Sequence, residues 1–397
     1  KDTTLSNLYI NMDGITLDLD GKKITISGDS TGNAITFFGT GITIRDGTIS
    51  DQRTANGKTT MSIGVQQEIT LTNVDLTFAN ALDETNTETS PSNIGVIVNC
   101  GTLNIDGTTT ISAMASEEST FRSVGVILIG NDADGSVEFN MSGSSSIKTG
   151  LFGISGDGSN GRGGTIINIS ESASVSASNG WGIYHPQNGV MKISGNANIS
   201  GLTGIEIRSG TLVIDGGSVT SVATEFNEEV NGNGGGPTIN SGVAVAVSQH
   251  TTDLPITVTI NNGTLTGIKA LYEVDLQNES VSNIAISVKG GVFDGSVSSE
   301  NVTQFISGGS FTEAPDAACI AQDYELVGDT ESGYFVQASP TIDESEDGTV
   351  TVKVPSTGGS ATLDSETVSE AIQKIEENTG AVDKAMDVNI GEADGVT

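Results

Sequence analysis

The 397-residue chain has few aromatic, cysteine and basic residues. Aromatic side chains make up 4% of the chain, with a single Trp, and only two Cys are present. Two Cys do not make the disulfide framework of a small secreted scaffold. The chain has 16 Lys and Arg against 50 Asp and Glu, a net charge of −34. That charge repels nucleic acid phosphates and anionic lipid, so neither is expected as a partner.

Long apolar runs are also missing, and none approaches the roughly 20 residues that a transmembrane helix needs. The chain begins at Lys1 with no apolar leader. We therefore expect a mature or trimmed segment of an extracellular or cell-surface protein, with signal peptide and anchor outside this sequence. Glycine, in contrast, is abundant at 52 residues. The apolar residues are mostly Ile, Val and Leu, which favours strands over helices.

A short marker, a small residue followed by apolar residues, recurs about every 30 residues. Examples are GVIV at Gly95, GVIL at Gly125, GISG at Gly153, GIYH at Gly182, GIEI at Gly204 and GVAV at Gly242. Each marker is followed by segments in which apolar and polar residues alternate, such as GTLNIDGTTTIS from Gly101. Gly, Asn, Asp and Ser separate these segments, and no helical pattern lies between them. Each repeat therefore predicts three short strands.

The pattern predicts an all-β fold, a right-handed single-stranded parallel β-helix of about ten to eleven coils. We expect the helix over residues 1–338, with a capping motif over 306–337. Residues 339–397 are predicted to form a small α+β module, or the start of a domain that continues further. In this module Ser365 is expected to begin a helix with Val368, Ile372 and Ile375 on one face. Cys100 and Cys319 fall on distant coils and are predicted to be free thiols.

Long insertions precede several marker strands and are expected to stand at one corner as a wall beside the marker face. They begin at Asp51, Ala79, Ala115 and Thr224. Loops held by a rigid scaffold often have functional roles, so this face is the candidate functional surface.

Two stretches resemble known families. The segment GITLDLDGKKITISG from Gly14 and the recurrent GTLxIxG segments resemble the right-handed β-helix, pectin-lyase-like superfamily. Ile306 to Gln337, which contains GGSF and a later GYF, is similar to the terminal motif of large cell-surface proteins of gut Gram-positive bacteria. The second resemblance implies an adhesin or stalk, with host or dietary glycans or cell-surface proteins as partners. The first implies an alternative, a polysaccharide lyase or glycoside hydrolase. A purely structural spacer is a third reading.

The enzyme alternative requires carboxylates on adjacent coils of the marker face. Stacking the markers gives an outward column with no run of carboxylates: Thr36, Gln66, Ile97, Ile127, Ser155, Tyr184, Glu206 and Ala244. Asp157, Glu206 and Arg208 are therefore only weak catalytic candidates. The simpler interpretation is that Glu206 and Arg208 form a surface ion pair that contributes little.

Glycan binding is the favoured hypothesis for this face, because sugars stack on aromatic rings flanked by hydrogen-bonding groups. Trp181 and Tyr184 share one coil in a chain poor in aromatics. The predicted binding set is Trp181, Tyr184, Asp157, Arg162, Glu206 and Arg208. The alternative is that Trp181 packs against a neighbouring loop, while His185 takes an inward position.

No cofactor and no metal site are predicted. DESEDG at Asp343 matches the first half of a calcium loop, but Val354 stands where the acidic twelfth residue belongs. NDADGS at Asn131 fails in the same way, and both segments are better interpreted as Asp-Gly turns. The one role left for Ca²⁺ is loose association with the acidic surface.

Overall fold

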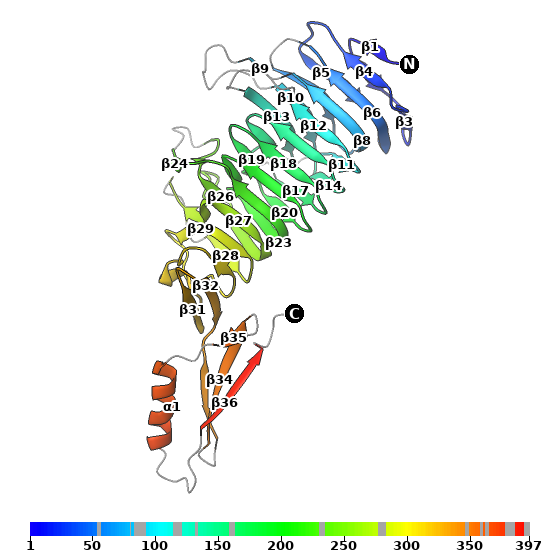
Figure 1. Ribbon diagram of the computed structural model, residues 1–397. Helices are drawn as coiled ribbons and strands as arrows, with labels where there is room; N and C mark the ends of the chain where they lie inside the picture. Colours follow the sequence, from blue (N-terminus) through cyan, green and yellow to red (C-terminus); the bar gives the residue numbers. More distant parts are fainter. Residues whose placement is uncertain are drawn as a thin grey trace.

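The computed structural model describes residues 1–53, 57–79, 81–82, 93–113, 121–131, 134–158, 163–229, 235–276, 283–345, 349–357, 360–361, 365–377 and 386–392. Successive coils stack along one axis from the N-terminal end to β29 (Figure 1). The predicted parallel β-helix is confirmed. Three parallel ladders of strands run along it, and we call them the marker, second and third sheets.

The marker sheet contains the strands that the sequence markers indicated, except that the marker GVQQ at Gly64 lies just after its strand, β7. Its pairings follow chain order through eleven segments: β2 (Leu8–Ile10), β5 (Gly32–Phe37), β7 (Lys58–Ile63), β10 (Asn93–Asn99), β13 (Phe121–Ile129), β16 (Phe152–Gly156), β19 (Trp181–His185), β22 (Thr203–Ile207), β26 (Val243–Ser248) and the ends of β27 (Ile256–Val274) and β29 (Val292–Ser299).

The second sheet continues each coil after a turn. Its members are β3 (Thr16–Asp18), the starts of β6 (Ile42–Asp51) and β8 (Glu68–Phe78), β11 (Thr102–Asp106), β14 (Val137–Met141), β17 (Thr165–Ile169), β20 (Gly189–Ile193), the starts of β23 (Gly210–Ser221) and β27, and β28 (Ile284–Val288).

The third sheet closes the coil. It consists of β1 (Thr3–Leu5), β4 (Lys23–Ile26), the ends of β6 and β8, β12 (Thr110–Ala113), β15 (Ser146–Thr149), β18 (Ser174–Ala177), β21 (Asn198–Gly201), the end of β23, the middle of β27, the start of β29, and β30 (Ser310–Phe311).

The core follows from the alternation in the sequence. On the marker strands the inward residue of each coil stacks on its counterpart, as Ile154, Ile183 and Ile205 do, and all three are fully buried or nearly so. The small residue of each marker is explained by close packing. A Cβ on Gly125 would lie 2.3 Å from Cγ2 of Ile147 and 2.6 Å from the carbonyl oxygen of Gly153. The marker is thus a steric requirement of the stacked coils.

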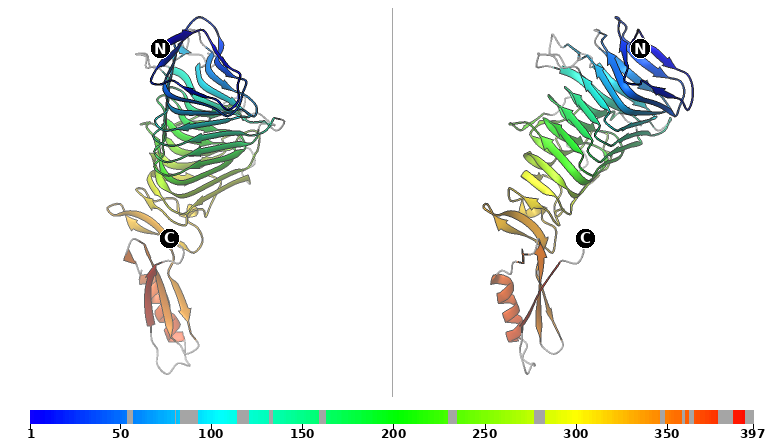
Figure 2. Two further views of the ribbon diagram at one scale, coloured as in Figure 1. Left: turned by 90° about the vertical axis from the view of Figure 1, so that its right-hand side faces the viewer. Right: turned by 45° about the vertical axis from the view of Figure 1, so that its right-hand side comes forward.

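The helix ends in an antiparallel cap. β30 pairs with β32 (Gly333–Ala338), which forms a hairpin with β31 (Tyr324–Asp329), and a 3₁₀ helix (Ala317–Cys319) lies between β30 and this hairpin. The rings of Phe293 and Phe311 stack with centroids 4.8 Å apart beneath this cap. Figure 2 shows the hairpin at the end of the stacked coils, with the remaining module beyond it. Cys100 and Cys319 are buried free thiols, as predicted.

A separate four-stranded sheet follows. It contains β33 (Thr341–Glu344), β34 (Val350–Thr357), β35 (Ser360–Ala361) and β36 (Met386–Glu392), with α1 (Ser365–Glu377) packed near it. One part of the predicted helix face is wrong. Ile372 is 45% exposed, and Ala371 is buried in its place. The stripe Val368, Ala371, Ile375 has the three- and four-residue spacing of a single helix face. Within the described ranges, no helix combines the length and apolarity needed to cross a membrane.

Candidate functional site

The marker sheet brings the predicted site residues into register. Ile97 pairs with Ile127, Ile127 with Ser155, Ser155 with Tyr184, and Tyr184 with Glu206. The outward column of marker-strand residues expected from the sequence is wrong at two positions. Ser62 stands in place of Gln66, and Ala246 in place of Ala244. The reason is that GVQQ at Gly64 is a turn after β7, while the register of β26 is set by Val245, which stacks on Ile205.

The insertion from Thr224 covers part of this sheet instead of standing only at its corner. Within it, β24 (Asn227–Glu228) and β25 (Ile239–Ser241) pair as an antiparallel ribbon. Ile239 packs with Ala246 and Tyr272 in a small apolar cluster outside the main core, and Phe226 packs against that cluster. We call the described parts of this insertion, 224–229 and 235–241, the covering loop. It removes the outward face of β19, β22 and β26 from solvent.

The predicted exposed position of Trp181 is wrong. Its side chain is 9% exposed, and the indole Nε1 donates to the carbonyl oxygen of Ile239 at 2.8 Å and to Oε2 of Glu206 at 3.1 Å. The ring stacks on Phe152 with centroids 5.1 Å apart. Trp181 therefore holds the covering loop against the coil, which agrees with the alternative that this residue packs against a neighbouring loop. Its ring presents no face to a sugar.

Glu206 and Arg208 are also buried, so the predicted surface ion pair is wrong. The Glu206 carboxylate accepts hydrogen bonds from Thr238 N at 2.8 Å, from Thr238 Oγ1 at 3.0 Å and from Ile239 N at 3.3 Å. Its Oε1 lies 3.8 Å from Nε of Arg208. Burial raises the pKa of Glu206, while Arg208 and the Thr238 hydrogen bonds oppose that rise. Because this carboxylate is enclosed and occupied, Asp157, Glu206 and Arg208 do not meet on one exposed surface as catalytic groups.

Arg208 is buried under the covering loop and forms hydrogen bonds to two loops. Its guanidinium donates to the carbonyl oxygens of Gly236 in the covering loop and of Gln249 at 2.8 Å, beyond β26. A longer hydrogen bond of 3.4 Å reaches Ser248. A buried arginine that donates to backbone carbonyls holds segments together.

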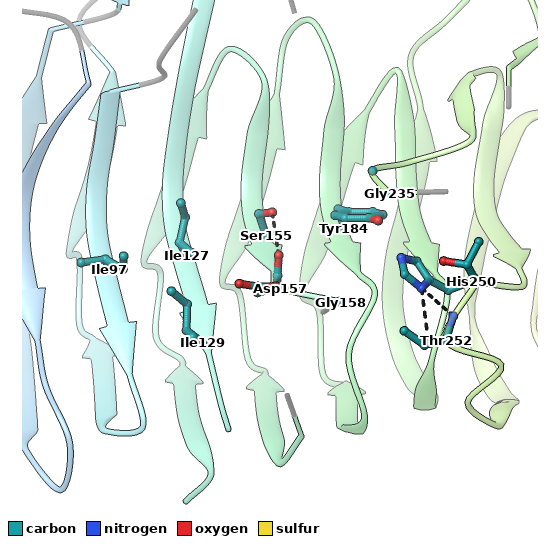
Figure 3. Close-up of a pocket in the computed structure, with 13 residues that line it drawn as sticks. Ile97, Ile127, Ile129, Ser155, Asp157, Gly158, Tyr184, Gly235, His250 and Thr252 are labelled. Carbon is teal, nitrogen blue, oxygen red and sulfur yellow. Dashed lines mark hydrogen bonds between the residues drawn. The ribbon is translucent and has the colours of Figure 1, made fainter. Parts of the chain in front are cut away.

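An open groove of about 610 Å³ lies on the marker sheet beside the covering loop (Figure 3). Ile97 of β10 and Ile127 and Ile129 of the neighbouring β13 line it, and all three are partly exposed. Tyr184 lines the groove further along the sheet, but its side chain is only 6% exposed, so the expected exposed ring is wrong here as well. The remaining lining residues come from the segment after β16, the covering loop and the turn after β26: Ser155, Gly156, Asp157, Gly158, Gly235, Gly236, His250, Thr251 and Thr252.

His250 and Asp157 give this end of the groove its polar character. Thr252 N donates to Nδ1 of His250 at 3.1 Å, so a neutral ring holds its proton on Nε2. A Cβ on Gly158 would lie 3.2 Å from that Nε2, so the segment after β16 approaches the imidazole closely. The backbone N of Asp157 donates to Oε1 of Gln187 at 3.0 Å, which fixes the position of this segment.

Two titratable side chains of the groove, His250 and Tyr184, are uncharged at neutral pH. Burial, with a smaller contribution from Arg208, lowers the pKa of His250 to about 4, so the ring is uncharged at neutral pH. Burial also raises the pKa of Tyr184, although Arg208 opposes this, and the phenol keeps its proton. At neutral pH the groove therefore offers neutral hydrogen-bonding groups and one carboxylate.

His185 is buried and pairs with the inward Ile207, so its predicted inward position is confirmed. Arg162 lies outside the described residues, as does 346–348 of the DESEDG segment. Among the residues that the structure does describe, no three His, Cys, Asp or Glu gather where they could share a metal ion.

No family model and no curated protein matches this chain. Among solved structures, one described as a new PL6 alginate lyase complex with trisaccharide aligns with 84% of this chain and 86% of its own. The identity is 9% and the TM-score 0.19. An overlap this weak gives no basis for transferring an activity.

Sequence reasoning missed His250 as a groove residue. The available signal was its rarity, since the chain has two His, and its place two residues after β26. The register error at Ala244 concealed it. With β26 aligned correctly, Ser248 lies level with Arg208, and His250 follows at the edge of the sheet, where the segment around Gly158 approaches it.

Proposed function

We propose that this chain is a β-helix that binds glycans at the cell surface or outside the cell, as an adhesin or stalk module, through the groove over Ile127. The observation that supports this most directly is the form of the groove. An apolar floor of three isoleucines meets hydrogen-bonding groups at one end. A sugar ring has C–H faces that pack on apolar side chains and hydroxyls that require such partners. The acidic surface and the resemblance of Ile306–Gln337 to surface-protein ends are consistent with an extracellular setting.

The proposed contacts differ from those expected from the sequence. Asp157 remains in the binding set because it lines the groove, and Tyr184 stays only as a largely buried wall of the groove. His250 joins them as a donor through Nε2. Trp181, Glu206 and Arg208 act as supports beneath the covering loop. Polysaccharide cleavage is not favoured, since the groove brings no second described carboxyl to face Asp157.

A glycan array probed with the wild-type protein and groove variants tests this proposal. We expect binding that His250→Ala weakens about tenfold, as the loss of a directional hydrogen bond predicts. Ile127→Arg should abolish binding by filling the floor of the groove. Val190→Arg is the matched control, because Val190 is 47% exposed on the second sheet.

Three outcomes would contradict the proposal. Binding that survives Ile127→Arg would place the ligand elsewhere. Silence across a broad array would favour a structural spacer. Release of reducing ends or unsaturated uronates from polysaccharides would favour the lyase or hydrolase alternative.

A further inference from the structure

We infer that the exposed rings of Tyr9 and Phe38 form a second sugar-binding subsite, and that the ligand is a polysaccharide that reaches from these rings to the groove. This inference rests on the proposed function and gives the length and direction of its ligand. It follows from what the marker sheet presents to solvent between its first coils and β13.

Tyr9 and Phe38 present their rings to solvent at the first two coils. The two residues are 59% and 62% exposed, and their ring centroids lie 6.0 Å apart with the planes tilted by 38°. Tyr9 pairs with Thr36, and Phe38 follows Thr36 by two residues, so both side chains point outward from the marker sheet. Nδ2 of Asn7 donates to the Tyr9 hydroxyl at 3.2 Å. Open ring faces beside hydrogen-bonding groups suit a sugar ring, which has C–H surfaces and hydroxyls.

One outward column of the marker sheet connects this ring pair to the groove. Its pairings follow chain order and join Tyr9, Thr36, Ser62, Ile97 and Ile127. Four strand spacings separate the ends of the column, which is about 19 Å. The rings and the isoleucine floor of the groove therefore lie on one face, along a line that runs parallel to the stacking axis.

The side chains between the rings and the groove are polar. Thr36 and Ser62 place hydroxyl groups on the path, and both residues are partly exposed. Asn99, two residues beyond Ile97, is exposed and pairs with Ile129 of the groove. These polar residues interrupt the continuous apolar surface that a protein partner buries at the centre of an interface. A polysaccharide packs its C–H faces on the rings and isoleucines and turns its hydroxyls to the polar residues between them.

Two subsites on one face predict a requirement for ligand length. A disaccharide occupies one subsite at a time. A longer chain that is bound at one subsite holds its other end near the second at high local concentration, so its affinity rises without any new kind of contact. The polysaccharide therefore crosses the marker strands.

Biolayer interferometry on the immobilised protein with oligosaccharides of two lengths tests this inference. The probes are the disaccharides and hexasaccharides of the cello-, manno-, xylo- and galacturono- series. We expect at least one hexasaccharide to bind wild type about tenfold more tightly than its disaccharide. The double substitution Tyr9→Ala and Phe38→Ala should remove most of this difference, because it deletes the ring faces. Tyr9→Trp should preserve the difference, since it retains a ring.

Tyr324→Ala is the matched control, because Tyr324 is a 37% exposed ring on β31 of the antiparallel cap. It should leave the affinity of both lengths unchanged. The midpoints of thermal unfolding of the ring variants should match that of wild type, because exposed side chains contribute little to stability.

The outcomes separate the inference from the proposed function. A length dependence that survives the double substitution, with binding still abolished by Ile127→Arg, would overturn the inference and leave the proposed function standing. Binding lost in the double variant but retained in Ile127→Arg would overturn the groove as the site, and with it the shared ligand. An equal loss in Tyr324→Ala would overturn the inference, since any exposed ring would then suffice. Absence of binding by every probe would overturn the proposed function and the inference together.

Discussion

His185 is a histidine placed where other coils have an aliphatic residue. It pairs with Ile207 inside the β-helix, is 1% exposed, and its Nε2 has no hydrogen-bond partner. Burial lowers its pKa to about 4. The folded protein therefore tolerates the neutral ring and disfavours the charged one, since no acceptor compensates the lost hydration.

This placement predicts a specific loss of stability in acid. The unfolded chain takes up the His185 proton near pH 6.5, while the folded chain takes it up only near pH 4. The free energy of unfolding should therefore fall as pH drops from about 6.5 to about 4, by about 3 kcal/mol for this residue. Urea unfolding of wild type and His185→Leu at several pH values measures it. The two curves should run parallel above about pH 6.5, and between about pH 6.5 and about pH 4 wild type should lose about 3 kcal/mol of stability relative to His185→Leu.

His250 titrates in the same direction and therefore needs its own control. Its pKa also lies near 4, so wild type contains both contributions. His250→Ala should retain the part of the acid sensitivity that His185→Leu removes. Parallel curves for wild type and His185→Leu would show that the buried ring is hydrated or paired in solution.

At the scale of elements, the covering loop is attached to the coil mainly through buried polar groups. Glu206 binds the backbone at Thr238 and Ile239, and Trp181 binds the Ile239 carbonyl. Arg208 adds the Gly236 carbonyl. Because Gly235 and Gly236 line the groove, these buried residues determine the shape of a surface that they do not touch.

Arg208→Met should release this loop. Removal of one partner leaves the Glu206 carboxylate buried beside an apolar side chain, which costs about 3–5 kcal/mol. Hydrogen exchange should accelerate at the Thr238 and Ile239 amides more than in the strands of the second sheet. Arg45→Met is the control, because Arg45 forms a half-exposed ion pair with Asp18 at 2.6 Å and little stability should be lost. Unchanged exchange at Thr238 and Ile239 would mean that the apolar cluster around Ile239 holds the loop alone.

The same elements show what the sequence could predict. Alternation along each coil and the small marker residue follow from local sterics, so the β-helix and its inward residues were predictable. The covering loop was not, because a residue that points outward from a strand can still be buried by a segment from elsewhere in the chain. Trp181, Glu206 and Arg208 were therefore identified as neighbours but assigned to the wrong environment. The sequence did contain one indication of this burial. Aromatic and basic residues are scarce in the chain, and their gathering on adjacent coils suggests that they share one structural role.

At the scale of the whole molecule, the excess of carboxylates opposes the stacking of coils. The 50 acidic residues far outnumber the 16 basic ones, so the excess carboxylates repel one another along a structure whose coils stack a strand spacing apart. Each coil contacts mainly its neighbours, so repulsion between adjacent coils acts on every interface along the helix. Screening should therefore stabilise the molecule as a whole.

The midpoint of thermal unfolding should accordingly rise as NaCl is increased from about 10 mM to about 150 mM, where the screening length falls from about 30 Å to about 8 Å. CaCl₂ at matched ionic strength distinguishes screening from ion binding. If Ca²⁺ is held only loosely by the acidic surface, its effect should exceed that of NaCl by a small, non-saturating amount. A saturable increase at low Ca²⁺ concentration would require a defined site, since binding to the folded state alone raises stability with the logarithm of ligand concentration. If the midpoint of thermal unfolding does not depend on NaCl, the carboxylates lie too far apart, or are too well paired, for their repulsion to destabilise the stacked coils.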